Sequence, residues 1–267
     1  MSVGSSNEPG SVSFDRAAEF YDATRPTAAY AIEGAVGVLD RHLPAGEPTL
    51  EIGVGTGALA VPLSARGRRI VGLDLSEAML RKLIEKDPAG SVPVVRGDAT
   101  QLPFSSGAFG GAYGRWVLHL IPAWPASVAE LCRVVRPGGS VALDPGGYSG
   151  EWREVWLRTL AELGAGSQPS GLDITRDEAS LDEAFAAGGA ELVGTDAVQV
   201  AYEGSLSTFF DNAEQRVYSW TWRVDDDDLH RGIAAARAWA ADRYGDVDVP
   251  FEPLASHPWR VYRIAAS

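Results

Sequence analysis

The chain has 267 residues, of which 45% are apolar and 22% charged, a balance typical of a globular protein that buries a large core without metal or disulfide. Its formal net charge of −13 disfavours contact with a phosphate backbone, so we expect no nucleic-acid partner. Cys132 is the single cysteine, which excludes an internal disulfide, and no apolar run approaches a membrane-spanning length; we expect a cytoplasmic protein with no membrane partner.

The N-terminal part predicts a loose segment followed by helices. Residues 1–13 lack both a basic start and an apolar run, so we expect a disordered lead rather than a signal peptide. Residues 14–30 carry apolar and aromatic side chains at helical spacing, interrupted at Arg25–Pro26, which predicts one or two short helices. A longer helix is expected over residues 28–42, ending at Pro44.

Between residues 49 and 144 the pattern alternates between strand and helix. Apolar runs predict strands over residues 49–52, 69–73, 92–96, 110–116 and 140–144. Helical periodicity predicts helices over residues 59–65, 76–86 and 125–135. Such alternation indicates an α/β fold, with a parallel sheet and helices on both faces.

Beyond residue 144 the alternation stops. Helices are expected over residues 152–163, 181–187, 208–216 and 229–244, and strands over residues 191–202 and 259–264. Because no repeat or long linker is present, the sequence predicts a single domain over residues 14–267. Its expected parts are a core over about 43–145, lid pieces over about 14–30, 146–188 and 205–250, and returning strands over about 190–203 and 257–265.

The most informative segment joins the first predicted strand to the helix that follows. It carries Gly53, Gly55 and Gly57, spaced two residues apart. Glycine allows the backbone to turn sharply, often at positive φ, and to lie directly against a ligand at the helix N-terminus. This turn predicts a nucleotide-sized ligand, with a purely structural turn as the alternative.

Acidic residues end the neighbouring strands. Asp74 follows Glu51 by 23 residues, the position of an acid that accepts hydrogen bonds from ribose hydroxyls. The alternative role for Asp74 is a helix cap beside Ser76. Asp98 could bond the exocyclic amine of adenine while Ala99 offers its N–H, or it could simply stabilise a turn. Glu51 could hold an amino group of the ligand, or it could be a strand-end charge that faces solvent.

Taken in their order and spacing, five segments resemble class I S-adenosylmethionine-dependent methyltransferases: LEIGVGTGAL, VGLDLSEAML, VRGDATQLPFSSGAF, YGRWVLHLI and LCRVVRPGGSVAL. The resemblance covers about residues 14–144 and is greatest to the small-molecule branch grouped with the ubiquinone and menaquinone methylases. It implies a Rossmann-like, seven-stranded, mostly parallel sheet with its last strand antiparallel, helices on both faces and an α-helical lid. It also implies S-adenosylmethionine as cofactor and a small-molecule acceptor.

The same resemblance assigns the site. The glycines would approach the cofactor, Arg115 and Trp116 would line its methionine side, Tyr21 could cover the methyl-transfer path, and Arg25 could pair with a carboxylate. The alternatives are packing for Tyr21 and a solvated charge for Arg25. The full set of expected cofactor-binding residues is Tyr21, Arg25, Glu51, Gly53, Gly55, Gly57, Asp74, Leu75, Met79, Asp98, Ala99, Arg115 and Trp116. Glu51 stands where the family more often has Asp, a change that keeps the charge.

Methyl transfer from a sulfonium needs chiefly proximity, alignment and exclusion of water, so a dedicated base is not required. If the acceptor is a hydroxyl, His119 could take its proton, although a histidine at this position is often structural. Tyr21 is the second candidate catalytic residue. No metal is expected, because the other histidines lack ligand spacing and the run Asp225–Asp228 suits a helix start.

Aromatic residues of the lid could line an acceptor pocket or pack the lid onto the sheet: Tyr148, Trp152, Trp156, Phe209, Phe210, Tyr218, Trp220 and Trp222. Oxygen, nitrogen, carbon and sulfur acceptors are all compatible with the motifs, as is any oligomeric state. Two other functions stay open. Gly53-x-Gly55-x-x-Ala58 also satisfies the dinucleotide fingerprint of an NAD-dependent oxidoreductase, and a non-catalytic regulator could bind the same cofactor on the same fold.

Overall fold

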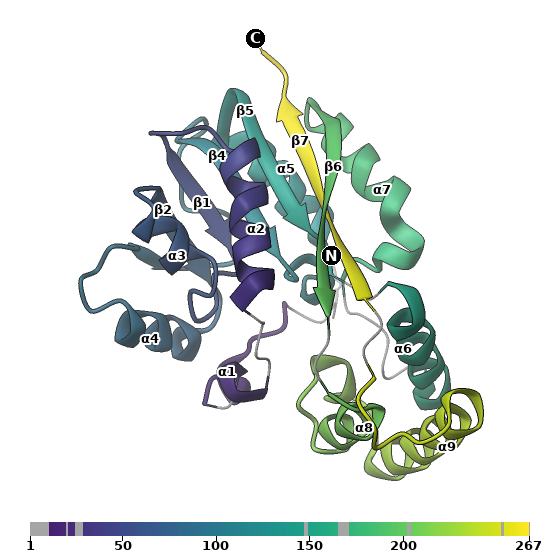
Figure 1. The fold of residues 1–267 in the computed structure, drawn as a ribbon. Coiled ribbons are helices and arrows are strands. Elements are labelled where there is room, and N and C mark those ends of the chain that lie inside the picture. The colour runs from purple at the N-terminus through teal and green to yellow at the C-terminus, as the bar shows by residue number, and fades with distance from the viewer. Residues whose placement is uncertain are drawn as a thin grey trace, which may run out of the picture.

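A computed structural model describes residues 11–19, 21–24, 29–146, 149–164, 171–201, 204–251 and 254–266 of the chain. At its centre is a seven-stranded sheet in the order β3-β2-β1-β4-β5-β7-β6 (Figure 1). The strands are β1 (Pro48–Ile52), β2 (Arg69–Asp74), β3 (Val94–Arg96), β4 (Phe109–Arg115), β5 (Val135–Asp144), β6 (Ala190–Ala201) and β7 (Leu254–Ile264). Strands β1 to β5 pair in parallel, whereas β7 runs antiparallel to both β5 and β6. The predicted Rossmann-like sheet, mostly parallel with an antiparallel last strand, is confirmed.

Helices cover both faces of this sheet. Their bounds are α1 (Tyr21–Thr24), α2 (Ala29–His42), α3 (Ala60–Ala65), α4 (Glu77–Lys86), α5 (Trp124–Val134), α6 (Gly150–Leu163), α7 (Ile174–Ala187), α8 (Leu206–Glu214) and α9 (Asp226–Tyr244). Short 3-10 turns are η1 (Asp15–Ala17), η2 (Leu118–Leu120) and η4 (Ser219–Thr221). Within the described ranges, none of the helices combines the length and the apolar character needed to cross a membrane.

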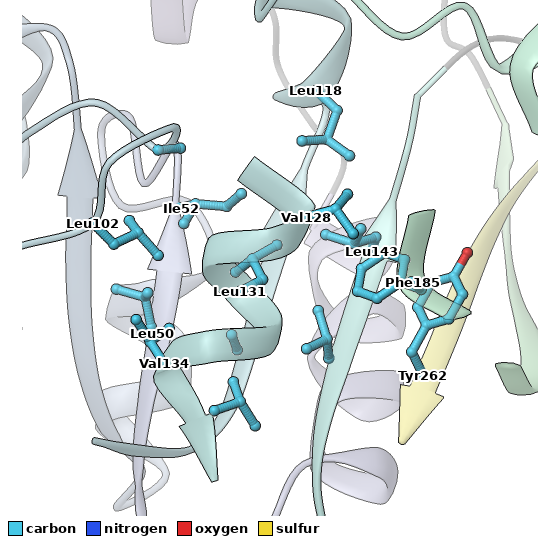
Figure 2. Close-up of a cluster of buried hydrophobic side chains, with 14 of the residues drawn as sticks. Leu50, Ile52, Leu102, Leu118, Val128, Leu131, Val134, Leu143, Phe185 and Tyr262 are labelled. Atoms are coloured by element: carbon cyan, nitrogen blue, oxygen red, sulfur yellow. The ribbon is translucent and has the colours of Figure 1, made fainter. Parts of the chain in front are cut away.

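Two apolar clusters hold the helical layers to the sheet. On one face, α2, α3 and α4 contribute buried residues such as Leu39, Leu63 and Leu83 to a cluster shared with the strands. On the other face, α5 and α7 pack against β1, β4, β5 and β7, and Figure 2 shows Leu131 of α5 and Phe185 of α7 within that cluster. Burial of both faces explains why the strands read as nearly continuous apolar runs.

A third cluster lies beyond the carboxyl ends of the parallel strands. Helices α6, α8 and α9 gather there (Figure 1), where their buried apolar residues contact one another. This packing is independent of the two sheet clusters, because most of its members come from these helices rather than from the strands. The three helices therefore form a small separate layer at the edge of the sheet where its parallel strands end.

Three elements begin at least five residues earlier than their patterns predict, and one of them is β7, which starts at Leu254 rather than at residue 259. Strand β5 starts at Val135 rather than at residue 140, because a bulge in its pairing with β4 between Phe109 and Gly111 accommodates the Pro-Gly-Gly segment. Helix α7 starts at Ile174 rather than at residue 181, with a non-helical Asp177 inside it. Asp177 Oδ2 accepts a hydrogen bond from the Asp173 amide at 2.9 Å. This polar contact lies at the start of the helix, where the sequence lacks the apolar periodicity on which the prediction was based.

Candidate active site

The carboxyl ends of the parallel strands bring the predicted site residues to one edge of the sheet. Glu51 of β1 lies opposite Tyr113 of β4, and Arg115 of β4 lies opposite Asp144 of β5. Asp74 ends β2, on the other side of β1. Open α/β sheets bind ligands beyond the carboxyl ends of their strands, at the point where the strand order changes direction. Here that point is β1, between β2 and β4.

The three glycines of the turn after β1 all have positive φ, at +66°, +53° and +82° for Gly53, Gly55 and Gly57. They differ in what surrounds them. A Cβ on Gly53 would lie 2.6 Å from Val117 Cγ2, and one on Gly57 would lie 2.9 Å from Leu83 Cγ. A Cβ on Gly55 would meet no described heavy atom within 4 Å. Packing therefore requires glycine at two positions, whereas Gly55 leaves its space open to a ligand.

Asp74 ties the second strand to this turn. Its Oδ2 accepts a hydrogen bond from the Gly55 amide at 2.8 Å, and its Oδ1 accepts one from the Ser76 amide at 2.8 Å. Ser76 itself caps α4 by accepting from the Met79 amide, so the predicted alternative of Asp74 as the cap is wrong. Burial raises the pKa of Asp74. Each carboxylate oxygen has a further lone pair, which a ribose hydroxyl could use.

Asp98 follows β3 and stabilises its own turn. Its Oδ1 accepts hydrogen bonds from the amide and the hydroxyl of Thr100, at 2.9 and 2.8 Å. Its Oδ2 has a longer contact, 3.3 Å from the Ser11 hydroxyl. The turn interpretation therefore accounts for one oxygen, and the second oxygen could accept from an adenine amine in place of Ser11. Ala99 beside it is buried in the core.

Glu51 is a buried carboxyl group at the end of β1. Its side chain is 4% exposed, so the alternative of a strand-end charge facing solvent is wrong. Tyr113 donates its hydroxyl to Glu51 Oε2 at 2.7 Å. Burial, with the nearby charge of Asp74, raises the pKa of Glu51 to about 8, although the Tyr113 hydrogen bond and Arg115 act in the opposite direction. An ammonium group beside Glu51 would stabilise its charged form.

The N-terminal segment crosses the loops that follow the strands. The Val12 amide donates to the Leu120 carbonyl at 3.0 Å, beyond β4. Asp15 Oδ1 accepts from the Ser76 hydroxyl at 2.6 Å and from the Ala78 amide at 3.1 Å, beyond β2. Together with the Ser11 contact beyond β3, these hydrogen bonds fasten one segment across the whole candidate site.

Apolar side chains complete this covering. Met79 is buried against Phe14 and Ala18, and Tyr21 packs against the same cluster. The Tyr21 ring lies 5.9 Å from the Phe14 ring, which supports packing as one role of Tyr21. Leu75 is half-buried beside Asp74. Arg25, also predicted here, lies outside the described residues.

Arg115 and Trp116 lie at the end of β4, as predicted, but toward β5 rather than β1. The Arg115 guanidinium lies 4.1 Å from the centre of the Trp116 ring, and its Nε is 3.4 Å from Asp144 Oδ2. Trp116 has φ of +53°, a conformation that costs a non-glycine residue free energy and is often found at functional sites. His119 lies nearby, because its Nδ1 would be 3.8 Å from a Cβ on Gly146.

Sequence reasoning missed three members of this edge: Tyr113, Asp144 and His257. Asp144 ends a predicted strand, so the rule that drew attention to Asp74 could have found it. Tyr113 and His257 carry no local signal. The His257 ring lies 5.4 Å from the Trp116 ring, across an antiparallel pairing that only the tertiary structure reveals.

Most of the predicted lid aromatics pack with one another. Trp152, Phe209 and Phe210 are buried in the cluster of α6, α8 and α9, and the rings of Tyr218 and Trp220 stack 5.2 Å apart beside them. Trp222 instead contacts Phe14, at 4.9 Å between ring centres. Packing is therefore the role that these contacts support. Tyr148 lies outside the described residues.

Two further groups have structural roles. Burial raises the pKa of the Cys132 thiol to about 11, so a reactive thiolate is disfavoured. Asp225 caps α9 by accepting from the Asp227 amide at 3.0 Å, as a helix start requires. Among the described residues, His, Cys, Asp and Glu form no group of three that could hold a metal ion.

Sequence comparisons agree with this geometry. A family described as a methyltransferase domain matches residues 50–143. A demethylmenaquinone methyltransferase of Desulfitobacterium hafniense is 40% identical over 106 residues, covering 35% of this chain and 41% of the relative. A malonyl-[acyl-carrier protein] O-methyltransferase of Serratia marcescens is 34% identical over 128 residues, covering 48% of this chain and 49% of the relative. The match thus spans about half, or less, of each of these relatives.

The fold is shared more widely than the sequence. An S-adenosylmethionine-dependent methyltransferase of Methanosarcina mazei superimposes with a TM-score of 0.56 at 13% identity, covering 86% of this chain and 98% of that one. None of these matches supports the alternative of an NAD-dependent oxidoreductase. The predicted resemblance is confirmed: residues 50–143 match a methyltransferase domain, and the solved structures of similar fold include an S-adenosylmethionine-dependent methyltransferase.

Proposed function

We propose that this protein transfers the methyl group of S-adenosylmethionine to a small-molecule acceptor and releases S-adenosylhomocysteine. The observation that carries this proposal is the arrangement around the turn after β1. Gly55 leaves open space, Glu51 offers a buried carboxyl group on one side, and Asp74 offers a carboxylate that already bonds the Gly55 amide on the other. These groups suit a ligand that has both an ammonium group and a ribose.

The residues would act mainly by binding and orienting. Glu51 would pair with the amino group of the cofactor, Asp74 with its ribose, and Asp98 with Ala99 with its adenine. Gly53 and Gly57 would hold the turn in shape around Gly55. Other contacts would come from the remaining predicted residues: Tyr21, Arg25, Leu75, Met79, Arg115 and Trp116. The bound sulfonium supplies an already activated methyl group.

Alignment and exclusion of water are then the main tasks of the chain. The N-terminal segment would exclude water by closing over the loops that it contacts. His119 could take a proton from a hydroxyl acceptor, and Tyr21 could cover the transfer path. We further propose that residues 14–267 form one domain. Of the disordered lead predicted over residues 1–13, residues 11–13 are instead held by the Ser11 and Val12 hydrogen bonds, and residues 1–10 lie outside the described residues. We also propose that the protein is cytoplasmic and binds no nucleic acid, on the basis of its single cysteine and its charge of −13.

Calorimetry tests the cofactor directly. S-adenosylhomocysteine should bind and NAD should not; the reverse result would overturn the proposal in favour of an oxidoreductase. Turnover is tested with isotope-labelled S-adenosylmethionine in a metabolite mixture, with mass analysis of the methylated product. Binding without turnover of any acceptor would favour the non-catalytic regulator.

Asp74→Ala tests the binding mode. Loss of its hydrogen bonds should weaken S-adenosylhomocysteine binding by about 1–3 kcal/mol. Asp74→Asn is the matched variant, since one amide oxygen can still accept a hydrogen bond and the loss should be smaller. An unchanged dissociation constant for Asp74→Ala would remove this residue from the site.

A further inference from the structure

A second group of polar side chains lies at the same edge of the sheet, one strand beyond Glu51. It consists of Trp116 after β4, Asp144 at the end of β5, and Gly146 and His257 beside them; we name these four residues the β5-edge recess. Two of its polar atoms, Trp116 Nε1 and Asp144 Oδ2, are buried and form no hydrogen bond with any described residue. An unsatisfied buried polar atom costs about 1–3 kcal/mol, so two in one place call for an explanation.

Both side chains lie beside Gly146. The Gly146 amide donates to Asp144 Oδ1 at 3.0 Å, which fixes the carboxylate against it. A Cβ on Gly146 would be 3.2 Å from Trp116 Cδ1, the ring atom bonded to Nε1. The indole edge and the carboxylate therefore both border a residue that has no side chain, and Arg115 contacts both of them.

The surroundings hold both groups in position. The Trp116 amide donates to the Asp144 carbonyl at 2.9 Å, and the Trp116 ring packs against the His257 ring. Asp144 is 2% exposed, and Arg115 Nε approaches its Oδ2 to 3.4 Å without forming a hydrogen bond. The positive φ of Trp116 adds a local conformational cost that packing alone does not require.

The donor and acceptor pattern selects a ligand chemistry. Trp116 Nε1 only donates, and an ionised Asp144 only accepts. A hydroxyl group satisfies both atoms, because its oxygen accepts from the indole while its hydrogen bonds the carboxylate. A protonated amine would satisfy Asp144 alone and would meet the positive charge of Arg115. The pattern therefore fits a neutral hydroxyl better than an ammonium group.

The position of the recess separates it from the cofactor's amino group. Glu51 lies on β1, whereas the recess spans the ends of β4, β5 and β7, on the far side of β4. Adjacent strands are about 4.8 Å apart, so the ends of β4, β5 and β7 lie roughly one to three strand spacings from β1. A cofactor whose amino group pairs with Glu51 would therefore have these residues as neighbours one strand or more away.

We infer that the β5-edge recess binds the hydroxyl group of the acceptor, so that the protein is an O-methyltransferase. The inference rests on the proposed function and names the acceptor chemistry of that same site. In the transfer, the acceptor oxygen bonds the methyl carbon and the carbon–sulfur bond breaks with its electron pair left on sulfur. The hydroxyl proton passes to Asp144 Oδ2 and then to solvent.

Indole NMR with two matched probes tests the inference. In protein saturated with S-adenosylhomocysteine, benzyl alcohol should shift the Trp116 Nε1–H resonance, and benzylamine, which has the same shape, should bind at least several-fold more weakly. Trp116→Phe assigns the resonance by removing it. Should that variant fail to fold, Asp144→Asn assigns it instead, because the Trp116 resonance is the one whose shift with benzyl alcohol this variant should change. Asp144→Asn should weaken benzyl alcohol binding by about tenfold, since it replaces a hydrogen bond to a charged group with at most a weaker one to a neutral amide.

Calorimetry on the same variants gives the second readout. Asp144→Asn should bind S-adenosylhomocysteine with a dissociation constant within about twofold of the parent. The control Asp87→Asn should do the same, since it removes another buried carboxylate, at the end of α4.

Benzyl alcohol that leaves the Trp116 resonance unshifted, or benzylamine that binds equally well, overturns the inference. So does weakened S-adenosylhomocysteine binding in Asp144→Asn, because Asp144 would then hold the cofactor rather than the acceptor. Absence of any S-adenosylhomocysteine binding to the parent protein instead overturns the proposed function, and this inference with it.

Discussion

At the scale of single residues, Glu51 is the group whose chemistry depends most on its surroundings. In the unliganded protein its pKa is about 8, so the side chain is mostly protonated at neutral pH. This protonated carboxyl group contributes stability that is fully present below the usual pKa of 4.5 and is lost as the pH rises toward 8. A bound ammonium group would instead stabilise the ionised form of Glu51, so the side chain would lose its proton.

Cofactor binding should therefore release a proton. Between pH 6 and 7.5 the affinity for S-adenosylhomocysteine should rise by up to about tenfold per pH unit, because Glu51 must ionise to pair with the ligand. Calorimetry in buffers of different ionisation enthalpy measures the proton directly. Tyr113→Phe should move the dependence to higher pH, since the Tyr113 hydrogen bond lowers the pKa of Glu51. Glu51→Gln should abolish the dependence, and a dependence that persisted in this variant would assign it to another group.

Gly55 and Gly67 offer a matched test of the open space in the turn. Both have positive φ, at +53° and +82°, and a Cβ on either would meet no described heavy atom within 4 Å. Alanine at each position should cost about 1–2 kcal/mol of folding free energy, measured by urea unfolding. Only Gly55→Ala should also weaken S-adenosylhomocysteine binding, because its Cβ would occupy the space of the ligand. Equal affinities in the two variants would contradict the proposed position of the cofactor.

At the scale of elements, the N-terminal segment joins loops that are distant in sequence. Ser11 contacts the loop after β3, Val12 the loop after β4, and Asp15 the loop after β2. Asp22 accepts from the Thr56 hydroxyl at 2.7 Å, in the turn after β1. A segment fastened to four strand ends must loosen some of these bonds to admit a ligand at this edge, so its opening should govern cofactor exchange.

Asp15→Ala tests this role. The Ser76 and Ala78 hydrogen bonds lower the pKa of Asp15, which shows that they favour its charged form. Their loss should speed the dissociation of S-adenosylhomocysteine by about 5–10-fold, equivalent to roughly one net hydrogen bond, in a stopped-flow displacement experiment. Ser13→Ala is the control, since it removes only two exposed hydrogen bonds to Asp15 and none to the loops beyond the strands. Identical rates in both variants would show that the segment does not govern exchange.

At the scale of the whole molecule, β7 completes the architecture by pairing with both β5 and β6. Helix α7 is held against it by the stacked rings of Phe185 and Tyr262, 3.7 Å apart, and by the Arg260 guanidinium, which hydrogen-bonds Asp182. Figure 2 shows both rings at the end of the cluster that continues through Leu143 to β1. Strand β7 therefore shares one apolar cluster with β1, the strand that leads into the candidate cofactor site.

Phe185→Ala should test this continuity. The side chain is fully buried, so its truncation should lower the free energy of unfolding by about 3–5 kcal/mol in urea titrations. Glu183→Ala on the exposed side of the same helix should change it by no more than about 0.5 kcal/mol. A small effect of Phe185→Ala would indicate that the C-terminal strands unfold separately from the rest of the sheet.

The sequence by itself determined the parts of this protein that local pattern records. Apolar runs, helical periodicity and three spaced glycines predicted the order of the elements and the turn at residues 53–57, and the acids at the ends of strands predicted Asp74 and Asp98. These signals are readable because each depends on neighbours a few residues away. The family resemblance followed from their order and spacing.

Only the tertiary structure decided which side chains meet across strands. Tyr113 reaches Glu51 because β1 and β4 pair in one register, and His257 reaches Trp116 because β7 lies between β5 and β6. Burial of Glu51 and the contacts of the N-terminal segment arise in the same way. The contacts of Tyr113 with Glu51 and of His257 with Trp116 join residues 62 and 141 positions apart; they depend on how the layers pack, and no local periodicity encodes that packing.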